Sequence, residues 1–333
     1  MNQIKELSIS RSPHLYAKPS AQWVMLQVII SLLFPTSAAI YFFGWHVLVM
    51  LIVGVVTAVL SEYLFQKIAR RKSTIKDLSA VITGMLIALS LPVTAPLWTI
   101  AVGSIFAIII VKQIGGGIGR NIFNPAVAAR VMLKVFFSPW ITNWVLPGED
   151  IVSTATPLEY IGHMTTSLPS EGIPSLTDLF LGVGLGGPIG ETSKLMILIG
   201  MIYLIIKRVI SPNLPIIYLA TLALTTSIAG GFQFDYYMTH VLSGTACFAA
   251  VYMITDYSSQ PLTRDGKLLY ALGAGLLTAI IRLLFNFPGG VGIAILIMNA
   301  LSPAIDRYLA PRIYGHQQRL KKNKAVREKV VIK

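Results

Sequence analysis

The sequence is poor in cysteine and in charge. Its one cysteine, among 333 residues, is Cys247. A single cysteine excludes an intramolecular disulfide, and it excludes a zinc site or an iron–sulfur cluster ligated by cysteines of this chain alone. Only 12% of the residues are charged, about half the share found in a soluble domain. Residues 1–20 are polar and lack an apolar core, so we expect no cleavable signal peptide.

Acidic residues are also scarce. The chain has 14 Asp and Glu against 27 Lys and Arg, which gives a formal net charge of +13. Nucleic-acid binding is one use of such an excess, but 54% of the residues are hydrophobic. Basic cytoplasmic loops between membrane spans account for the charge better. We therefore expect an all-α, polytopic membrane protein in a lipid bilayer, with no nucleic-acid partner and no metal site.

Apolar runs long enough to cross a bilayer recur along the whole chain. The pattern predicts about ten spans, near 23–43, 45–65, 78–91, 97–111, 125–137, 195–206, 214–229, 241–254, 268–285 and 291–309. The expected organisation is a cytoplasmic arm, a first membrane repeat, a polar loop, a second membrane repeat and a basic tail, at 1–20, 21–137, 138–193, 194–310 and 311–333.

Lysine and arginine are absent from every second loop between these spans. The segment 138–193 contains none, and neither do about 230–240 and 286–290. The alternate loops are all basic, at 67–76, 112–120, 207–208 and 264–267, as is the tail. Because basic loops remain in the cytoplasm, both termini are expected there, and the 138–193 loop on the outer side of a bacterial cytoplasmic membrane.

Two parts of the chain repeat a similar order of motifs. In the first half, Thr83-Gly84 precedes a Gly-rich segment at 115–119 and then Asn124-Pro-Ala. In the second half, Ser243-Gly244 precedes a Gly-rich segment at 289–292 and then Asn299 with Pro303. The alternative is coincidence in a Gly-rich membrane protein. A true repeat of five spans each would be inverted, as in transporters that build a polar site near the membrane midplane.

The longest polar loop contains Asp150-Ile-Val-Ser-Thr-Ala-Thr-Pro-Leu158. Its simplest interpretation is a hydroxyl-rich turn that Pro157 keeps from becoming helical. However, Asp-x-x-Ser-Thr-Ala-Thr resembles the signature at which flavin transferases attach FMN to a threonine through a phosphoester. The last threonine, Thr156, is then the acceptor. The small Ser153 and Ala155 leave it accessible, and Asp150 helps to present it.

A second polar cluster lies before the fifth span. Asn124 is well placed as the N-cap of a helix whose first residue is Pro125. The functional alternative is that Asn121 and Asn124, three residues apart and next to Arg120, hydrogen-bond the edge of a flavin ring together.

Other charged residues have competing interpretations. Arg130 and Lys134 lie within the fifth span, where charges usually face a cavity or a partner, although Lys134 could extend to the interface instead. For Asp256 and Asp265 a helix end and a turn are favoured over function. Cys247 is expected to face lipid or to pack in the core.

These motifs occur together in an order that resembles a known family. From Ser12-Pro13-His14, through the Gly115–Asn121 segment, Asn124-Pro-Ala and the Thr156 motif, to the last span, the chain resembles the D subunit of the bacterial Rnf complex. It is similar, more distantly, to the B subunit of the Na⁺-translocating NADH:quinone reductase. One departure is Thr154, where that family often has glycine, which adds bulk and a competing hydroxyl.

The resemblance implies a flavin-carrying subunit of an ion-translocating ferredoxin:NAD⁺ oxidoreductase. It implies FMN bound covalently to Thr156, and a second, non-covalent flavin, expected to be riboflavin, near Asn121 and Asn124. It also implies two inverted five-helix repeats folded like urea transporters. The implied partners are the other membrane and peripheral subunits, and a flavin transferase. No complete turnover and no catalytic residue are expected in this chain alone.

Two other classes of protein fit parts of the sequence. The inverted repeat would suit a secondary transporter or channel for a small polar solute. A membrane scaffold is the second alternative. Neither requires a flavin acceptor in the outer loop, so a covalently bound flavin separates both from the redox protein.

Overall fold

The computed structural model describes residues 20–145, 156, 158, 174–285, 287 and 289–309. Within these ranges the elements are α-helices, two 3₁₀ helices and one π-helical segment. The arm at 1–19 and the tail from 310 lie outside the described residues, as do Asp150, Ser153 and Ala155.

The described residues of the first half form six α-helices, one 3₁₀ helix and one π-helical segment. In chain order they are α1 (Ala21–Phe43), α2 (His46–Ile68), η1 (Ile75–Asp77), α3 (Ser79–Leu89), α4 (Leu97–Ile105), the π-helical η2 (Phe106–Ile114), α5 (Pro125–Phe136) and α6 (Ser138–Ile141). Local sequence explains several boundaries. Ser20 caps α1 by accepting a hydrogen bond from the Trp23 amide, and Asn124 caps α5 ahead of Pro125.

The second half follows the long polar loop that the sequence predicts on the outer side. Its elements are α8 (Leu176–Leu181), η3 (Ile189–Glu191), α9 (Lys194–Ile206), α10 (Asn213–Ala229), α11 (Phe234–Leu242), α12 (Ala246–Tyr252), α13 (Arg264–Leu284) and α14 (Gly290–Tyr308). Side chains of Ser175, Ser193 and Thr263 cap α8, α9 and α13. The helix starts therefore follow local sequence closely.

Five helices are long and apolar enough to cross a membrane: Ala21–Phe43, His46–Ile68, Leu97–Ile114, Arg264–Leu284 and Gly290–Tyr308. Three shorter apolar helices, α3, α9 and α10, accompany them. Large apolar side chains point outward from the long helices, among them Ile52 and Ile110, as a lipid-facing surface requires. The chain is a polytopic, helical membrane protein, and the predicted count of ten spans stays a prediction.

The eighth predicted span is not one helix. A continuous helix over 241–254 is wrong, because α11 ends at Leu242 and α12 begins only at Ala246. Between them Gly244 has φ +65, a conformation that L-residues with side chains rarely adopt. The third span agrees with expectation, because α3 (Ser79–Leu89) falls within the predicted 78–91. Composition indicated the right apolar segments but did not locate the breaks.

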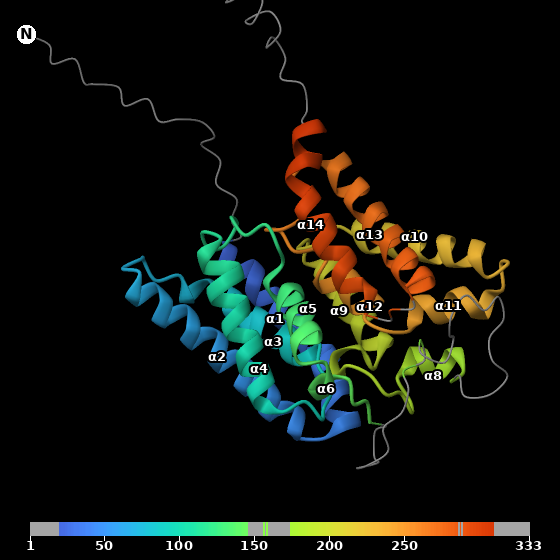
Figure 1. Ribbon diagram of the computed structural model, residues 1–333, viewed down its shortest axis with the longest axis horizontal. Helices are drawn as coiled ribbons and strands as arrows, with labels where there is room; N and C mark the ends of the chain where they lie inside the picture. The colour runs from blue at the N-terminus through green and yellow to red at the C-terminus, as the bar shows by residue number, and fades with distance from the viewer. Residues whose placement is uncertain are drawn as a thin grey trace, which may run out of the picture.

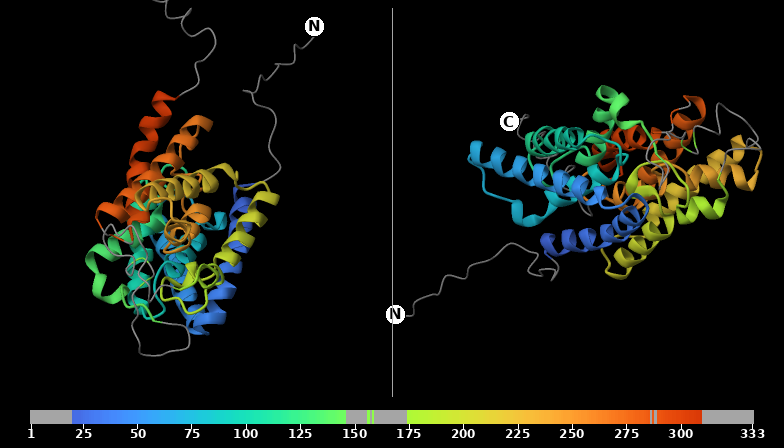
Figure 2. Two further views of the ribbon diagram at one scale, coloured as in Figure 1. Left: turned by 90° about the vertical axis from the view of Figure 1, so that its right-hand side faces the viewer. Right: turned by 90° about the horizontal axis from the view of Figure 1, so that it is seen from below.

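The two halves of the chain form adjoining groups of helices. Figure 1 shows the first half in blue to green beside the second half in yellow to red, and the right-hand view of Figure 2 separates them in the same way. Within the first group α2 packs on α3 and α4, and within the second α10 packs on α11, α12 and α13. Across the boundary α1 packs on α9, and α5 packs on α14.

Segments predicted on one side of the membrane meet at one end of this bundle. Arg71 donates to the carbonyl of Gln113, and Asp306 near the end of α14 accepts from the amides of Leu262 and Thr263. The opposite end brings together the predicted outer segments: Thr94 donates to the carbonyl of Asn143, and Ile189 donates to that of Leu91.

Candidate functional site

A cavity at the first of these ends contains the predicted asparagines. It is lined by the start of α1, by α3, by the loop before α5 and by residues 255–258 after α12. The space open to the centre of a water molecule is about 90 Å³, several times what one water needs. We call it the Asn121 cavity. It joins the two halves of the chain, since its walls come from both.

Both asparagines are buried at this cavity, at 3% exposure each. Asn121 donates from Nδ2 to the carbonyl of Phe123 and to Ser258 Oγ, at 3.0 and 3.1 Å. Asn124 accepts at Oδ1 from the amides of Ala126 and Val127 and donates to the carbonyl of Met253. The capping role is therefore real, and it does not exclude a ligand, because both side chains also line the cavity.

Arg120 is exposed and is absent from the residues lining the cavity. Its side chain lies against Gly116, whose added Cβ would meet Arg120 Cδ at 3.1 Å. The structure thus brings Asn121 and Asn124 to one cavity and leaves Arg120 on the surface.

Asp256 is a charged residue of the Asn121 cavity. Its carboxylate accepts from the hydroxyls of Ser258 and Ser259, at distances of 2.8 to 3.1 Å. Burial raises the pKa of Asp256, and the serine hydrogen bonds act in the opposite direction. The sequence favoured a simple turn at Asp256, which is correct locally but misses its place in the cavity wall. Asp265, in the first turn of α13, is exposed.

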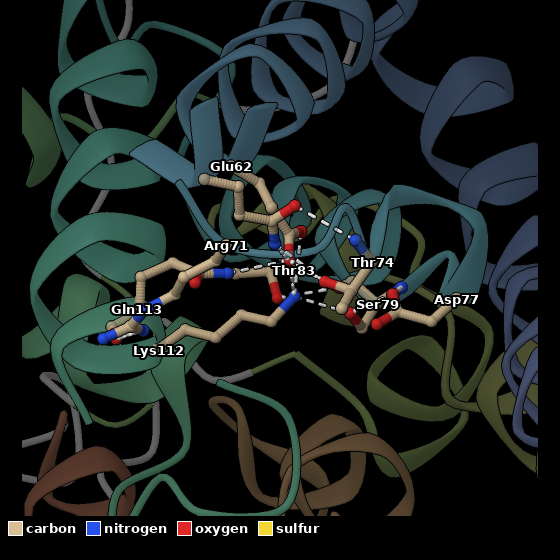
Figure 3. A network of polar contacts seen from close by, with 9 residues as sticks. Glu62, Arg71, Thr74, Asp77, Ser79, Thr83, Lys112 and Gln113 are labelled. Carbon is tan, nitrogen blue, oxygen red and sulfur yellow. Dashed lines mark hydrogen bonds and ion pairs between the residues drawn. The ribbon is translucent and has the colours of Figure 1, made fainter. Parts of the chain in front are cut away.

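Lys112 completes the polar wall of this cavity, together with Ser79 and Thr83. The Lys112 ammonium lies 2.9 Å from both carboxylate oxygens of Glu62, and the two side chains are 3% and 0% exposed. Figure 3 shows this buried network, in which Gln113 and Thr74 also donate to Glu62. Sequence reasoning passed over the pair, although a lone glutamate inside the second apolar span was the available signal.

A smaller pocket at the opposite end contains Thr156. Its walls include Gly187, Glu191, Lys194, Ser243 and Gly244, and the space open to the centre of a water molecule is about 20 Å³. We call it the Thr156 pocket. A side chain at position 244 would meet Leu158 Cδ1 at 2.8 Å and Arg282 Nη2 at 3.1 Å, so glycine permits the broken helix to approach this pocket closely.

Buried charge surrounds the Thr156 pocket. Arg282 donates to the carbonyls of His240 and Ser243, at 2.5 and 3.2 Å, where α11 ends. Glu191 is buried, which raises its pKa, while Arg130, Lys194, Arg282 and Lys134 act on it in the opposite direction. Of these cations, Lys194 lines the pocket and Arg282 lies next to Gly244 in its wall, whereas Arg130 and Lys134 line a separate groove. The two cations at the pocket outnumber the Glu191 carboxylate, and such a region suits an anionic group.

The two charged residues of α5 have a groove of their own. Arg130 and Lys134 line a cavity of about 210 Å³ between α5 and α14, with Phe287 and Gly289. The Lys134 ammonium lies 4.0 Å from the centre of the Phe287 ring, within the range of a cation–π contact. Cys247, predicted to pack or to face lipid, is partly buried and donates to the carbonyl of Val241.

The described structure has membrane-crossing helices, a cavity at each end of the bundle, and buried charges beside both cavities. These features define a polytopic membrane protein with a candidate site at each end. The chain belongs to the NQR2, RnfD, RnfE family, whose model matches residues 8–315. The predicted resemblance is thereby confirmed at the level of the family.

Named relatives match over nearly their whole length. The chain is 42% identical to the D subunit of the Na⁺-translocating ferredoxin:NAD⁺ oxidoreductase complex of Acetobacterium woodii, over 98% of this chain and 100% of that protein. It is 37% identical to the D subunit of the proton-translocating ferredoxin:NAD⁺ oxidoreductase complex of Clostridium ljungdahlii, over 94% and 98%. It is 35% identical to the D subunit of the ion-translocating oxidoreductase complex of Stutzerimonas stutzeri, over 91% and 94%.

Proposed function

We propose that this protein is the D subunit of an ion-translocating ferredoxin:NAD⁺ oxidoreductase complex, carrying one flavin at the Thr156 pocket and another in the Asn121 cavity. The family and the full-length similarity to D subunits support the complex. The observation that supports the redox role is the position of Thr156, the last residue of the acceptor motif, in a pocket lined by Lys194 and with Arg282 next to Gly244 in its wall.

At the outer end, Thr156 would hold FMN through a phosphoester. Lys194 and Arg282 would offset the negative charge of the phosphate. The Glu191 carboxylate compensates part of the positive charge of these two side chains. Asp150, Ser153 and Ala155 of the motif remain proposals for recognition by the flavin transferase. Thr154 and Ser153 are the alternative acceptors.

At the cytoplasmic end, Asn121 and Asn124 would bind the second flavin, for which riboflavin is the candidate. Its ring edge presents carbonyls and nitrogens that need hydrogen-bond partners, and its faces need apolar contact. The Asn121 cavity offers amides, hydroxyls and a carboxylate beside apolar residues such as Met25 and Ile82. A bound flavin supplies the chemistry, since it accepts electrons one or two at a time, and the chain positions it.

The fold supports an inverted repeat. The elements α1 to α5 correspond in order to α9, α10, the broken α11–α12, α13 and α14. Contacts between the equivalent pairs α1 with α9 and α5 with α14 are those a two-fold arrangement would make.

We propose that changes in flavin charge on the two sides are coupled to Na⁺ or H⁺ movement between these repeats. Electrons enter and leave through the other membrane and peripheral subunits.

The rival function, a secondary transporter or channel for a small polar solute, uses the same repeat. It gives no reason for the acceptor motif at Thr156. Covalent flavin therefore decides between the two.

The test is Thr156→Val, which keeps the shape of the side chain and removes the hydroxyl. The denatured parent protein should show a fluorescent band under ultraviolet light in a gel, and the variant should show none while remaining in the membrane. Thr177→Val, at an exposed position on α8, is the matched control and should keep the fluorescence. A band of undiminished fluorescence in Thr156→Val would move the acceptor to Thr154 or Ser153, and a dark parent would remove the redox proposal.

A further inference from the structure

The Glu62–Lys112 pair is the ion pair found among the described residues, and both side chains are withdrawn from water. Desolvating two charges costs several kcal/mol per ion, so a buried pair contributes little to stability by itself. Apolar residues would fill the same space at no such cost. A role in function is therefore the better reason for its presence.

The Glu62 carboxylate is held by many donors. Its Oε1 accepts from Gln66, Thr74 and Gln113, at 3.0, 3.0 and 2.8 Å, in addition to Lys112. This set of neighbours holds the carboxylate in one position and satisfies its lone pairs. Figure 3 shows Thr74, from the loop before η1, and Lys112 and Gln113, from η2, converging on it.

The Lys112 ammonium is held just as firmly. Besides Glu62 it donates to Ser79 Oγ at 2.6 Å, and Ser79 in turn donates to Asp77. Lys112 lies in the π-helical segment η2, a rare geometry that often occurs at functional sites. A long, flexible side chain is thus fixed in one place, as a positioning role requires.

The pair is asymmetric with respect to the Asn121 cavity. Lys112 and its partner Ser79 line the cavity, whereas Glu62 is not part of its wall. Of the two charged side chains, Lys112 is therefore the one next to the ligand space. In surroundings of low dielectric, this arrangement is a fixed dipole whose positive end faces the ligand space. The other charged residue of that space, Asp256, comes from the other half of the chain, and its carboxylate accepts hydrogen bonds from the hydroxyls of Ser258 and Ser259.

We propose that Lys112 sets the reduction potential of the flavin in the Asn121 cavity, by stabilising the negative charge that the flavin ring gains on reduction. The inference rests on the proposed function, which supplies the second flavin. Two electrons from the neighbouring redox groups of the complex and one proton from water would give a reduced ring with one negative charge. A fixed ammonium at the cavity wall favours that form over the neutral oxidised ring and so raises the potential.

The experiment uses the purified full-length chain in detergent. The potentials of its two flavins are measured by spectroelectrochemical titration, and the non-covalent flavin is identified by its release on denaturation. The informative variant is Lys112→Met combined with Glu62→Gln, because it removes the positive charge without leaving a buried carboxylate unpaired. Lys112→Arg keeps the charge and is the rescue variant. Lys76→Met removes an exposed lysine at the same end and is the control.

We expect the double variant to shift the ratio of oxidised to reduced non-covalent flavin at least tenfold toward the oxidised form. That corresponds to a fall in potential of about 30 mV for a two-electron couple. Lys112→Arg and Lys76→Met should keep the parent potential, and the covalent flavin should be unchanged in all variants. A purely structural role would lower the yield or the flavin content and leave the potential of the remaining flavin unaltered.

Two results would overturn the inference, and they are distinguishable. A non-covalent flavin whose potential is the same in the double variant and the parent removes the role of Lys112 alone. A parent protein that releases no flavin on denaturation removes the second flavin of the proposed function, and the inference with it.

Discussion

At the scale of single residues, the functional side chains of this protein serve structure and site at once. Asn124 caps α5 through Oδ1 and reaches the other half of the chain through Nδ2. Asn121 likewise connects the loop before α5 to Ser258. A ligand in the Asn121 cavity would therefore meet amides whose orientation is already fixed, which reduces the entropy lost on binding.

Substitutions can separate the capping role of Asn124 from the binding of a ligand by Asn121 and Asn124. Asn121→Leu and Asn124→Ser should each lower the flavin released per chain on denaturation, without lowering the covalent flavin. Loss of one hydrogen bond to a buried ring costs about 1–3 kcal/mol, or roughly tenfold in affinity. Serine keeps a capping oxygen, so Asn124→Ser should retain most of the cap contribution of about 1 kcal/mol.

The control is Asn213→Leu, at an exposed position at the start of α10, which should change neither flavin. If both cavity variants release as much flavin as the parent, Asn121 and Asn124 are only elements of helix structure.

At the scale of elements, close helix contacts depend on glycine. Gly54 of α2 and Gly84 of α3 face each other so tightly that a Cβ on Gly54 would meet the carbonyl oxygen of Gly84 at 2.7 Å, and a Cβ on Gly84 would overlap the carbonyl of Gly54. In membranes, such small residues allow helices to pack by direct backbone contact. This crossing holds α3 in place, and α3 contributes Ser79 and Thr83 to the cavity wall.

Gly84→Ala should therefore destabilise the protein more than an equivalent change elsewhere. The added methyl group meets backbone, which cannot rotate away, so a cost in the upper part of the usual range of about 1–3 kcal/mol for overpacking is expected. Gly103→Ala on α4 meets Leu133 Cδ1 at 2.8 Å, and that side chain can adjust. Thermal unfolding in detergent should show a larger drop in Tm for Gly84→Ala, and an equal or smaller drop would contradict the packing argument.

At the scale of the whole molecule, the arrangement separates two chemically different ends. Around the Asn121 cavity the described surface carries exposed basic residues, among them Arg71, Lys72 and Arg120. Near the Thr156 pocket the cations Lys194 and Arg282 are buried. Exposed positive charge gathered at one end of the described structure is the pattern that fixes orientation in the membrane, and it predicts the Thr156 end on the outer side.

This orientation can be tested with cysteines at exposed positions in a Cys247→Ala background. Thr177→Cys on α8 should react with a membrane-impermeant thiol reagent added to intact cells, whereas Ser73→Cys, between α2 and η1, should react only in inverted vesicles. The reverse pattern would invert the topology and with it the sides assigned to both flavins.

Much of the fold was predictable because a segment that crosses the membrane has to be helical, apolar and long enough to span the bilayer. The expected helices at 23–43, 125–137 and 214–229 correspond within a few residues to α1, α5 and α10. The cap at Asn124 and the family were predictable as well, since both depend on local sequence. The break between α11 and α12 was not predictable from the sequence, because it depends on a distant residue. Arg282, 39 residues from Ser243, donates hydrogen bonds to the carbonyl groups that are left free where α11 ends.

Composition and local motifs were enough to establish the class of protein, the positions of most helices and the candidate residues Thr156, Asn121 and Asn124, because none of these needs a distant partner. Which charges share a site depends instead on tertiary packing. Glu62 and Lys112 are 50 residues apart and meet at 2.9 Å, and Asn121 meets Ser258 across 137 residues. Each side chain brings its own chemistry, but burial and proximity arise only when the helices pack and exclude water. For Glu62 and Lys112 that packing is within the first half of the chain, and for Asn121 and Ser258 it is between the two halves.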